Sequence, residues 1–296
     1  MKILKDLKSK PFGGVWSIAD QEVLDCTDIF FKKINYGYCI ENTNTQNFLN
    51  KYFSYIKESN NKLIGIENYQ SLAFSLGTTN SFDAFYIKHN NKIIVSFAGE
   101  YVYHNILQRT TYGETKIIDN FEDLSTGHAL IISVPFADTG NEPEHLEKIL
   151  DTCDKKNIPV LIDMAYINVA QEITINLNHK CIEGITSSLS KLFPLSTLRI
   201  GIRMQKENID DGVDMISGVN YVNKLGIALA DCLINNFAND YIFSKYKQQQ
   251  QKLCSDLGVK PSKTVILGID TNNKFDEYNR GGNTNRLCFS KKFETK

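Results

Sequence analysis

Residues 129–163 contain a strand, a helix and a second strand in succession. The two flanking runs, ALIISV (129–134) and VLID (160–163), are continuously apolar, as in strands that are covered on both faces of a sheet. Between them, residues 142–155 (EPEHLEKILDTCDK) have apolar side chains at helical spacing on one face. This succession predicts a parallel sheet with helical crossovers.

The same alternation continues on both sides of this unit. Short apolar runs at 92–97 (KIIVSF), 182–187 (IEGITS) and 198–202 (LRIGI) predict further buried strands, and residues 81–89 and 102–109 have helical spacing. Strands and helices that alternate in this way are typical of α/β domains. We therefore predict an α/β fold with a mainly parallel sheet flanked by helices.

The pattern changes after about residue 205. Residues 213–247 have one long helical periodicity, and strand candidates follow at 264–269 and 287–290. These elements predict a small C-terminal α+β domain. The predicted division is an N-terminal arm at 1–40, a large domain at 41–205, an interdomain helical region at 206–240 and a small C-terminal domain at 241–296.

The composition excludes several classes of protein. Apolar residues make up 42% and charged residues 23% of the chain, and the formal net charge of −1 comes with no stripe of Lys or Arg, which argues against binding to nucleic acid or to an anionic membrane. The seven cysteines are scattered without a CxxC pair, which argues against a disulfide framework and a structural metal site. No apolar stretch is long enough for a signal peptide or a membrane span, so we expect a cytoplasmic protein.

Chemically useful side chains lie at the ends of the predicted elements. The segments are 75–80 (SLGTTN), 99–104 (GEYVYH), 160–166 (VLIDMAY) and 185–191 (ITSSLSK), with Arg199 in the later string LRIG. Taken alone, Lys191 is better explained as a surface lysine at the end of a strand. The pair formed by SxSK and R-x-G eight residues later is a more specific pattern.

This pair, with the string D-x-A-Y that starts 28 residues before Lys191, resembles the class I and II aminotransferases, which are pyridoxal 5'-phosphate (PLP) enzymes of fold type I. The resemblance is clearest from about residue 70 to 205 and weaker as far as Arg286. It implies that PLP is the cofactor, that Lys191 holds it as a Schiff base, and that an amino group moves between an amino acid and a 2-oxoacid. It also implies a homodimer with shared active sites. The chain is shorter than typical members, and we expect the reduction mainly in the C-terminal domain.

The resemblance assigns roles to the residues of these segments. Lys191, Asp163 and Tyr166 are the implied catalytic residues: the carboxylate keeps the ring nitrogen of PLP protonated, and the tyrosine hydroxyl contacts the 3-oxygen. The implied cofactor-binding residues are Gly77, Thr78, Thr79, Tyr101, Asp163, Tyr166, Ser188, Ser190, Lys191, Arg199 and, from a neighbouring copy, Tyr38.

Each part of the cofactor needs its own kind of group. Arg199 suits the phosphate as a planar bidentate donor, and Ser188 is favoured over Ser190 as a hydroxyl donor. The segment 77–79 starts a helical pattern whose free amides suit an anion, although an ordinary N-cap explains it equally well. Asp163 is likewise explained by a cap at the end of a strand.

Aromatic residues and a second arginine complete the prediction. Tyr101 is the expected stacking partner of the ring, with Tyr103 or His104 as alternatives, and a core position is the competing explanation. Either Tyr36 or Tyr38 is expected to reach the phosphate of the neighbouring copy.

Arg286, in the string NRLCF (285–289), matches the arginine that clamps the α-carboxylate of the substrate, and a solvent-facing strand arginine is the alternative. One departure stands out, because the N-P-T-G turn of the family aligns with residues 137–140 (ADTG). The missing asparagine leaves Tyr166 as the main partner of the 3-oxygen.

Other functions remain open on the same residues. A decarboxylase, a β-eliminating lyase or a racemase would use the same cofactor, and a degenerate member kept for binding would need none of its chemistry. An unrelated α/β protein with chance matches is the remaining alternative.

Overall fold

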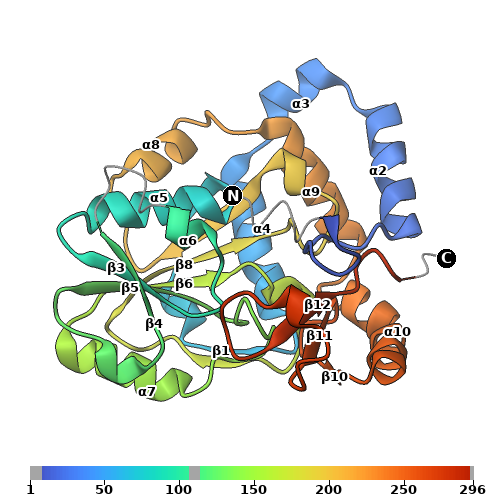
Figure 1. The fold of residues 1–296 in the computed structure, drawn as a ribbon. Helices are drawn as coiled ribbons and strands as arrows, with labels where there is room; N and C mark the ends of the chain where they lie inside the picture. Colours follow the sequence, from blue (N-terminus) through green and yellow to red (C-terminus); the bar gives the residue numbers. More distant parts are fainter. Residues whose placement is uncertain (1–8, 107–113, 294–296) are drawn as a thin grey trace.

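The computed structural model describes residues 9–106 and 114–293. At its centre is a seven-stranded sheet (Figure 1) with the strand order β2-β9-β8-β6-β5-β3-β4. The strands are β2 (Ser71–Leu76), β9 (Ile200–Gln205), β8 (Ile182–Ser188), β6 (Val160–Met164), β5 (His128–Ser133), β3 (Ile93–Phe97) and β4 (Thr115–Ile118). Strand β9 is antiparallel to both of its neighbours, and all other pairs are parallel. The predicted α/β fold with a mainly parallel sheet is therefore confirmed.

The continuous apolar run in β5 reflects helices on both faces of the sheet. Successive side chains of a strand point to opposite faces. Ile131 packs in a small core with α5 (Thr78–Lys88), whereas Ile132 belongs to the main core, which includes the apolar face of α7 (Leu146–Lys156). The two helices lie on opposite sides of the sheet in Figure 1. Both alternating sets of β5 side chains are therefore buried.

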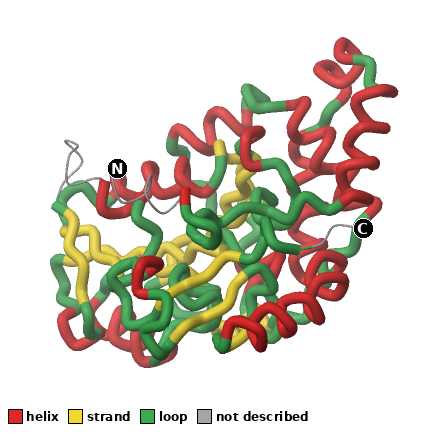
Figure 2. The backbone as a smooth tube through the Cα atoms, turned by 45° about the vertical axis from the view of Figure 1, so that its right-hand side comes forward, coloured by secondary structure: helices red, strands yellow, loops and turns green. Residues whose placement is uncertain are grey.

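Most of the remaining elements lie above, below and to one side of this layer, as the red helices in Figure 2 show. The other helices are α2 (Gln21–Lys33), α3 (Tyr36–Asn42), α4 (Thr45–Lys57), α6 (Tyr103–Ile106), α8 (Gly212–Gly218), α9 (Lys224–Asn236) and α10 (Tyr241–Leu257). A short parallel pair joins β1 (Lys62–Ile64) to β7 (Thr174–Asn176). A separate antiparallel sheet contains β10 (Lys260–Pro261), β11 (Leu267–Asp270) and β12 (Asn285–Cys288).

The N-terminal arm is fixed to this smaller sheet and to α10. Phe12 accepts a backbone hydrogen bond from Cys288 at 2.9 Å, and its ring lies 5.9 Å from the ring of Phe289. Further along the arm, the fully buried Asp20 accepts hydrogen bonds from Tyr246 and Lys245 at 2.7 and 2.8 Å. The intervening residues are thus held in place from both ends.

One predicted element is wrong. Residues 213–247 are not one helical stretch but parts of α8, α9 and α10. Asn220, with φ at 61°, has the left-handed conformation that ends a helix, and Asn223 caps α9 by accepting a hydrogen bond from Gly226 at 2.9 Å. Helices α9 and α10 pack apolar faces against the main core, whereas α8 contacts β2 and α5 and leaves Met215 and Ile216 exposed.

Several boundaries also differ from the prediction. Strand β9 begins two residues later than expected, because Leu198 lies in a 3-10 turn. Strand β11 begins at Leu267, after a turn at 264–266. Of the helix predicted at 102–109, α6 covers the part up to Ile106, and residues 107–109 lie outside the described ranges. Strands β1, β2, β4, β7 and β10 and the helices α2, α3 and α4 were not predicted.

Candidate active site

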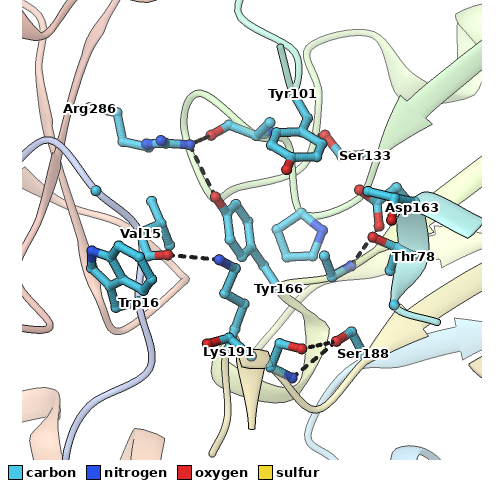
Figure 3. Close-up of a pocket in the computed structure, with 18 of the residues that line it drawn as sticks. Val15, Trp16, Thr78, Tyr101, Ser133, Asp163, Tyr166, Ser188, Lys191 and Arg286 are labelled. Carbon is cyan, nitrogen blue, oxygen red and sulfur yellow. Dashed lines mark hydrogen bonds between the residues drawn. The ribbon is translucent and has the colours of Figure 1, made fainter. Parts of the chain in front are cut away.

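A cavity of about 420 Å³ lies at the carboxyl ends of β5, β6 and β8 (Figure 3), where parallel α/β sheets commonly bind ligands. Of the predicted site residues, those that line it are Gly77, Thr78, Thr79, Tyr101, Asp163, Tyr166, Ser188, Ser190, Lys191, Arg199 and Arg286. Tyr38 does not line this cavity: it lies on α3, is 67% exposed and faces a separate hollow beside α9.

Lys191 lies in the turn after β8 and points into the cavity (Figure 3). Its Nζ donates a hydrogen bond to the carbonyl of Val15, in the N-terminal arm, at 2.7 Å. Burial lowers the pKa of Lys191 to about 8, with smaller contributions from the cations of Arg286 and Arg199 and opposing ones from Cys288 and Asp163. A substantial share of the amine is therefore neutral, and nucleophilic, near physiological pH.

Asp163 closes the end of β6 and is almost completely buried. Its Oδ1 accepts a hydrogen bond from the backbone of Ala165 at 2.9 Å. Burial, followed by the negative charge of Glu100, raises its pKa to about 7, whereas Ala165 and Lys191 act in the opposite direction. A cation placed next to this carboxyl group would stabilise its ionised form.

Tyr166 and Arg286 meet across the two sheets. Arg286, on β12 of the smaller sheet, is buried, and its Nη1 donates to the Tyr166 hydroxyl at 3.1 Å and to the carbonyl of Ala137. Burial raises the pKa of Tyr166 to about 12, although Arg286 opposes the shift. The hydroxyl therefore keeps its proton at neutral pH, and the guanidinium faces the cavity (Figure 3).

A cluster of donors lies at the start of α5. Gly77 has φ at 74°, and a Cβ there would collide with the guanidinium of Arg199. That guanidinium donates to Thr79 Oγ1 at 3.1 Å, while Thr78 is the first residue of α5, where the helix leaves free backbone amides. A helix N-terminus beside an arginine is a favourable site for a phosphate group.

The serines of the lysine turn face the same cluster. Ser188 Oγ lies 2.8 Å from Ser190 Oγ and 3.0 Å from the carbonyl of Ile200, and it accepts from the backbone of Ser190. This tight turn fixes the peptide that leads into Lys191. Two hydroxyl groups are thereby added to the anion-binding side of the cavity.

Of the three aromatic candidates, Tyr101 is the one that lines the cavity. Its ring stacks on that of Tyr103 at 6.1 Å and 14°, and the ring of His104 meets it edge-on at 6.1 Å and 89°. Tyr103 instead donates to Asp83 at 2.8 Å, and His104 is buried against Tyr86.

Sequence reasoning missed part of the lining. The unpredicted residues are Gly13, Gly14, Val15, Trp16, Ser133, Pro135, Ala137, Ala165, Ser196, Thr197 and Arg280. The Gly13-Gly14 pair was a visible signal, because two successive glycines let a backbone approach a ligand closely. Arg280 carried no such signal, since it lies in a polar loop without periodicity.

The donor set fits PLP. The partly neutral amine of Lys191 suits its aldehyde, and the buried carboxyl group of Asp163 suits a protonated ring nitrogen. The phosphate suits the cluster of Gly77, Thr78, Thr79 and Arg199.

Comparisons with known proteins point in the same direction. Residues 116–260 match the family model described as aminotransferase class I and II. No curated protein matches the sequence. In the part of the chain that the structure describes, no helix is long and apolar enough to cross a membrane.

Solved structures share the fold at low sequence identity. A PLP-bound putative aminotransferase from Clostridium difficile 630 has a TM-score of 0.69 and 14% identity, over 98% of this chain and 90% of that one. A single mutant of Thermus thermophilus aspartate aminotransferase has a TM-score of 0.64 and 15% identity, over the same shares. L-threonine-O-3-phosphate decarboxylase from Porphyromonas gingivalis has a TM-score of 0.62 and 11% identity, over 94% and 93%.

Proposed function

Because the chain matches the class I and II aminotransferases over residues 116–260 and shares their fold, which together indicate PLP as its cofactor, we propose that it is a PLP-dependent aminotransferase. It would move an amino group between an amino acid and a 2-oxoacid. The observation that carries the proposal is the meeting of Lys191, Asp163 and Arg286 in one cavity.

The residues that would hold the cofactor follow from the fit described above. Lys191 would hold its aldehyde, and Tyr101 would cover a face of its ring. Asp163 would bind the ring nitrogen, and Tyr166 the 3-oxygen. When bound, PLP supplies an electron sink that stabilises negative charge at the α-carbon of an amino acid.

Lys191 has two tasks in this proposal. Its partly neutral amine binds the cofactor and, once released by the substrate amine, accepts the proton of the α-carbon as a general base. The carbonyl of Val15, which accepts from Nζ at 2.7 Å, provides a hydrogen-bond acceptor for the free amine.

Arg286 orients the substrate. Its guanidinium is held in one orientation by hydrogen bonds to the Tyr166 hydroxyl and the Ala137 carbonyl. Part of the entropy cost of ordering this side chain is therefore met before the substrate binds. A carboxylate bound here in two-point fashion would place the α-carbon toward Lys191, which lies across the cavity in Figure 3.

The proposal includes a homodimer. Tyr36 and Tyr38 on α3 are 65% and 67% exposed, which leaves them free to contact a second copy. One of them, Tyr38 in our assignment, would reach the phosphate side of the neighbouring cavity. Mixing Tyr38→Phe protein with a Lys191→Ala variant and assaying the mixed dimers tests this arrangement.

The main rival is decarboxylation on the same scaffold, which the similarity to the P. gingivalis enzyme supports. A degenerate member is less well supported, because the lysine, the carboxyl group and the arginine cluster all face one cavity. Product analysis separates the activities: a 2-oxoacid indicates transfer, and carbon dioxide indicates the rival.

The first experiment is an absorbance spectrum of the protein with PLP, before and after a pool of amino acids is added. We expect a protonated-imine band that Lys191→Ala lacks and that amino acids bleach. The variant Lys92→Ala, at the amino end of β3, where Nζ donates to the carbonyl of Thr126 at 2.9 Å, is the matched control and should behave as wild type. An identical band in Lys191→Ala would refute the assignment.

A further inference from the structure

Glu100 is a buried carboxyl group directly behind the cavity wall. It lies between β3 and α6 and is only 5% exposed, yet it does not itself line the cavity. Within the described ranges, no salt bridge involves it. Burying a carboxylate without a cation is costly, so other interactions must stabilise it.

Three hydrogen bonds meet at this carboxylate. Ser133 donates its backbone N–H to Oε1 at 2.7 Å and its hydroxyl to Oε2 at 2.6 Å. The backbone N–H of Tyr101 donates to Oε2 at 3.1 Å. Both donor residues line the cavity, so Glu100 joins the loop that carries the Tyr101 ring to the end of β5.

The connection continues to the substrate side of the cavity. Ser133 Oγ accepts from the backbone of Ala137 at 2.8 Å, and the carbonyl of Ala137 accepts from Arg286. On the adjacent strand, Ser133 is paired in register with Asp163. Glu100 therefore lies one strand away from the carboxyl group expected beneath the ring nitrogen.

We propose that Glu100 is a positioning residue of this active site, which holds Tyr101 and Ser133 at the cavity wall and adds a second carboxylate next to Asp163. The inference rests on the proposed function, because it concerns the same cofactor. Glu100 touches no reacting atom and acts through its neighbours.

The charge of Glu100 gives a signature that packing alone would not. Burial raises its pKa to about 7, with the bonds from Ser133 and Tyr101 opposing and Asp138 adding to the rise. The ionisable groups that face it are Asp138, Asp163, Tyr86 and Tyr166. Because the charge of Glu100 also raises the pKa of Asp163, removing that charge should let Asp163 ionise at a lower pH.

The test measures PLP binding to the apoprotein in a Lys191→Ala background, which removes the covalent link and the titration of the lysine. The single tryptophan, Trp16, lines the cavity, so its fluorescence reports binding. Glu100→Gln should weaken binding roughly tenfold, because the amide nitrogen cannot accept the bonds that Oε1 or Oε2 accepts. It should also move the pH midpoint of binding downward by about one unit. The titration of PLP itself is common to both proteins and cancels in this comparison.

A matched control is Glu183→Gln. Glu183 lies at the start of β8, away from the cavity at the end of this strand, and its carboxylate pairs with Lys88 and His89. It should leave both the affinity and the midpoint unchanged. Glu100→Asp keeps the charge but shortens the reach, so it should weaken binding without moving the midpoint. This variant carries the test if Glu100→Gln does not fold.

The outcomes separate the two proposals. If PLP binds neither the wild type nor the Lys191→Ala parent, the proposed function fails. If PLP binds but the substitutions at Glu100 change neither affinity nor midpoint, the positioning role is refuted and the proposed function stands. Weaker binding of Glu100→Gln at an unchanged midpoint would also refute the part assigned to the charge.

Discussion

Replacing Asp20 by asparagine should destabilise the protein by removing the anchor of the N-terminal arm. Asp20 is fully buried, and its Oδ2 accepts from the hydroxyl of Tyr246 at 2.7 Å and from Lys245 at 2.8 Å. Its Oδ1 accepts from Val23 at 3.1 Å and caps α2. Asparagine preserves the cap but places an NH2 group where Oδ2 accepts two donors.

The magnitude follows from what each donor loses. Tyr246 is fully buried, so its unsatisfied hydroxyl should cost about 1–3 kcal/mol. Lys245 keeps its bonds to Glu22 and Tyr241 and is one-quarter exposed, which limits its loss to about 0–1 kcal/mol. Together these terms predict that the free energy of unfolding falls by about 1–4 kcal/mol.

Urea denaturation at pH 7 measures this change, with Glu22→Gln as the matched control because it removes the exposed partner of the same lysine. The control should cost less than about 1 kcal/mol. Although burial raises the pKa of Asp20, the bonds from Lys245 and Tyr246 lower it overall below its ordinary value. Its stabilising effect is therefore complete above the unfolded pKa and is lost as the pH falls through the folded one, so the difference between wild type and Asp20→Asn should shrink in acid. A loss below 1 kcal/mol at pH 7, or an equal loss in the control, would refute this account.

Three further predictions concern the cavity. Gly77→Ala should weaken PLP binding roughly tenfold, because the backbone there has φ at 74° and a Cβ would collide with Arg199. Gly127→Ala, with open space around it, should leave binding unchanged, and titration of both apoproteins with PLP measures the two affinities. Arg286→Lys should lower kcat/KM for the amino acid about 100-fold and leave the Kd for PLP unchanged, because a single ammonium cannot replace the planar guanidinium. Equal losses in both constants would contradict the role of Arg286 in binding the substrate carboxylate. The rate at which the apoprotein reacts with pyridoxal should rise with pH and level off above about 8, the pKa of Lys191, and a rise that continues beyond pH 10 would be inconsistent with a desolvated amine.

The sequence predicted the central sheet well because its signals are local. A run such as ALIISV at 129–134 is apolar throughout only when both faces of a strand are covered, so the pattern itself contains the layer arrangement. Most of the predicted site residues lie in loops at the ends of central strands, and parallel strands bring their carboxyl ends to one edge of the sheet; Arg286 instead lies within β12 of the smaller sheet. Tyr38 depends on a second copy of the chain and stays a prediction.

What the sequence did not show depends on contacts between distant segments. Val15 faces Lys191 across 176 positions, and nothing near Val15 marks it as a partner of an amine. Glu100 binds Ser133, 33 positions away, from a loop whose local pattern suggests only a turn. The periodicity at 213–247 was misleading for a local reason, because three successive helices each have apolar residues at helical spacing, although only α9 and α10 pack against the main core.

Arg286 belongs to the smaller sheet, while Lys191 and the phosphate-side donors belong to the larger one. In the proposed enzyme, substitutions around β11 and β12 would therefore act first on the group expected to bind the substrate, and would reach the cofactor side through the bond from Arg286 to Tyr166. The same division guides a protein engineer, for whom the loop between these two strands is the natural place to begin a library for altered substrate preference.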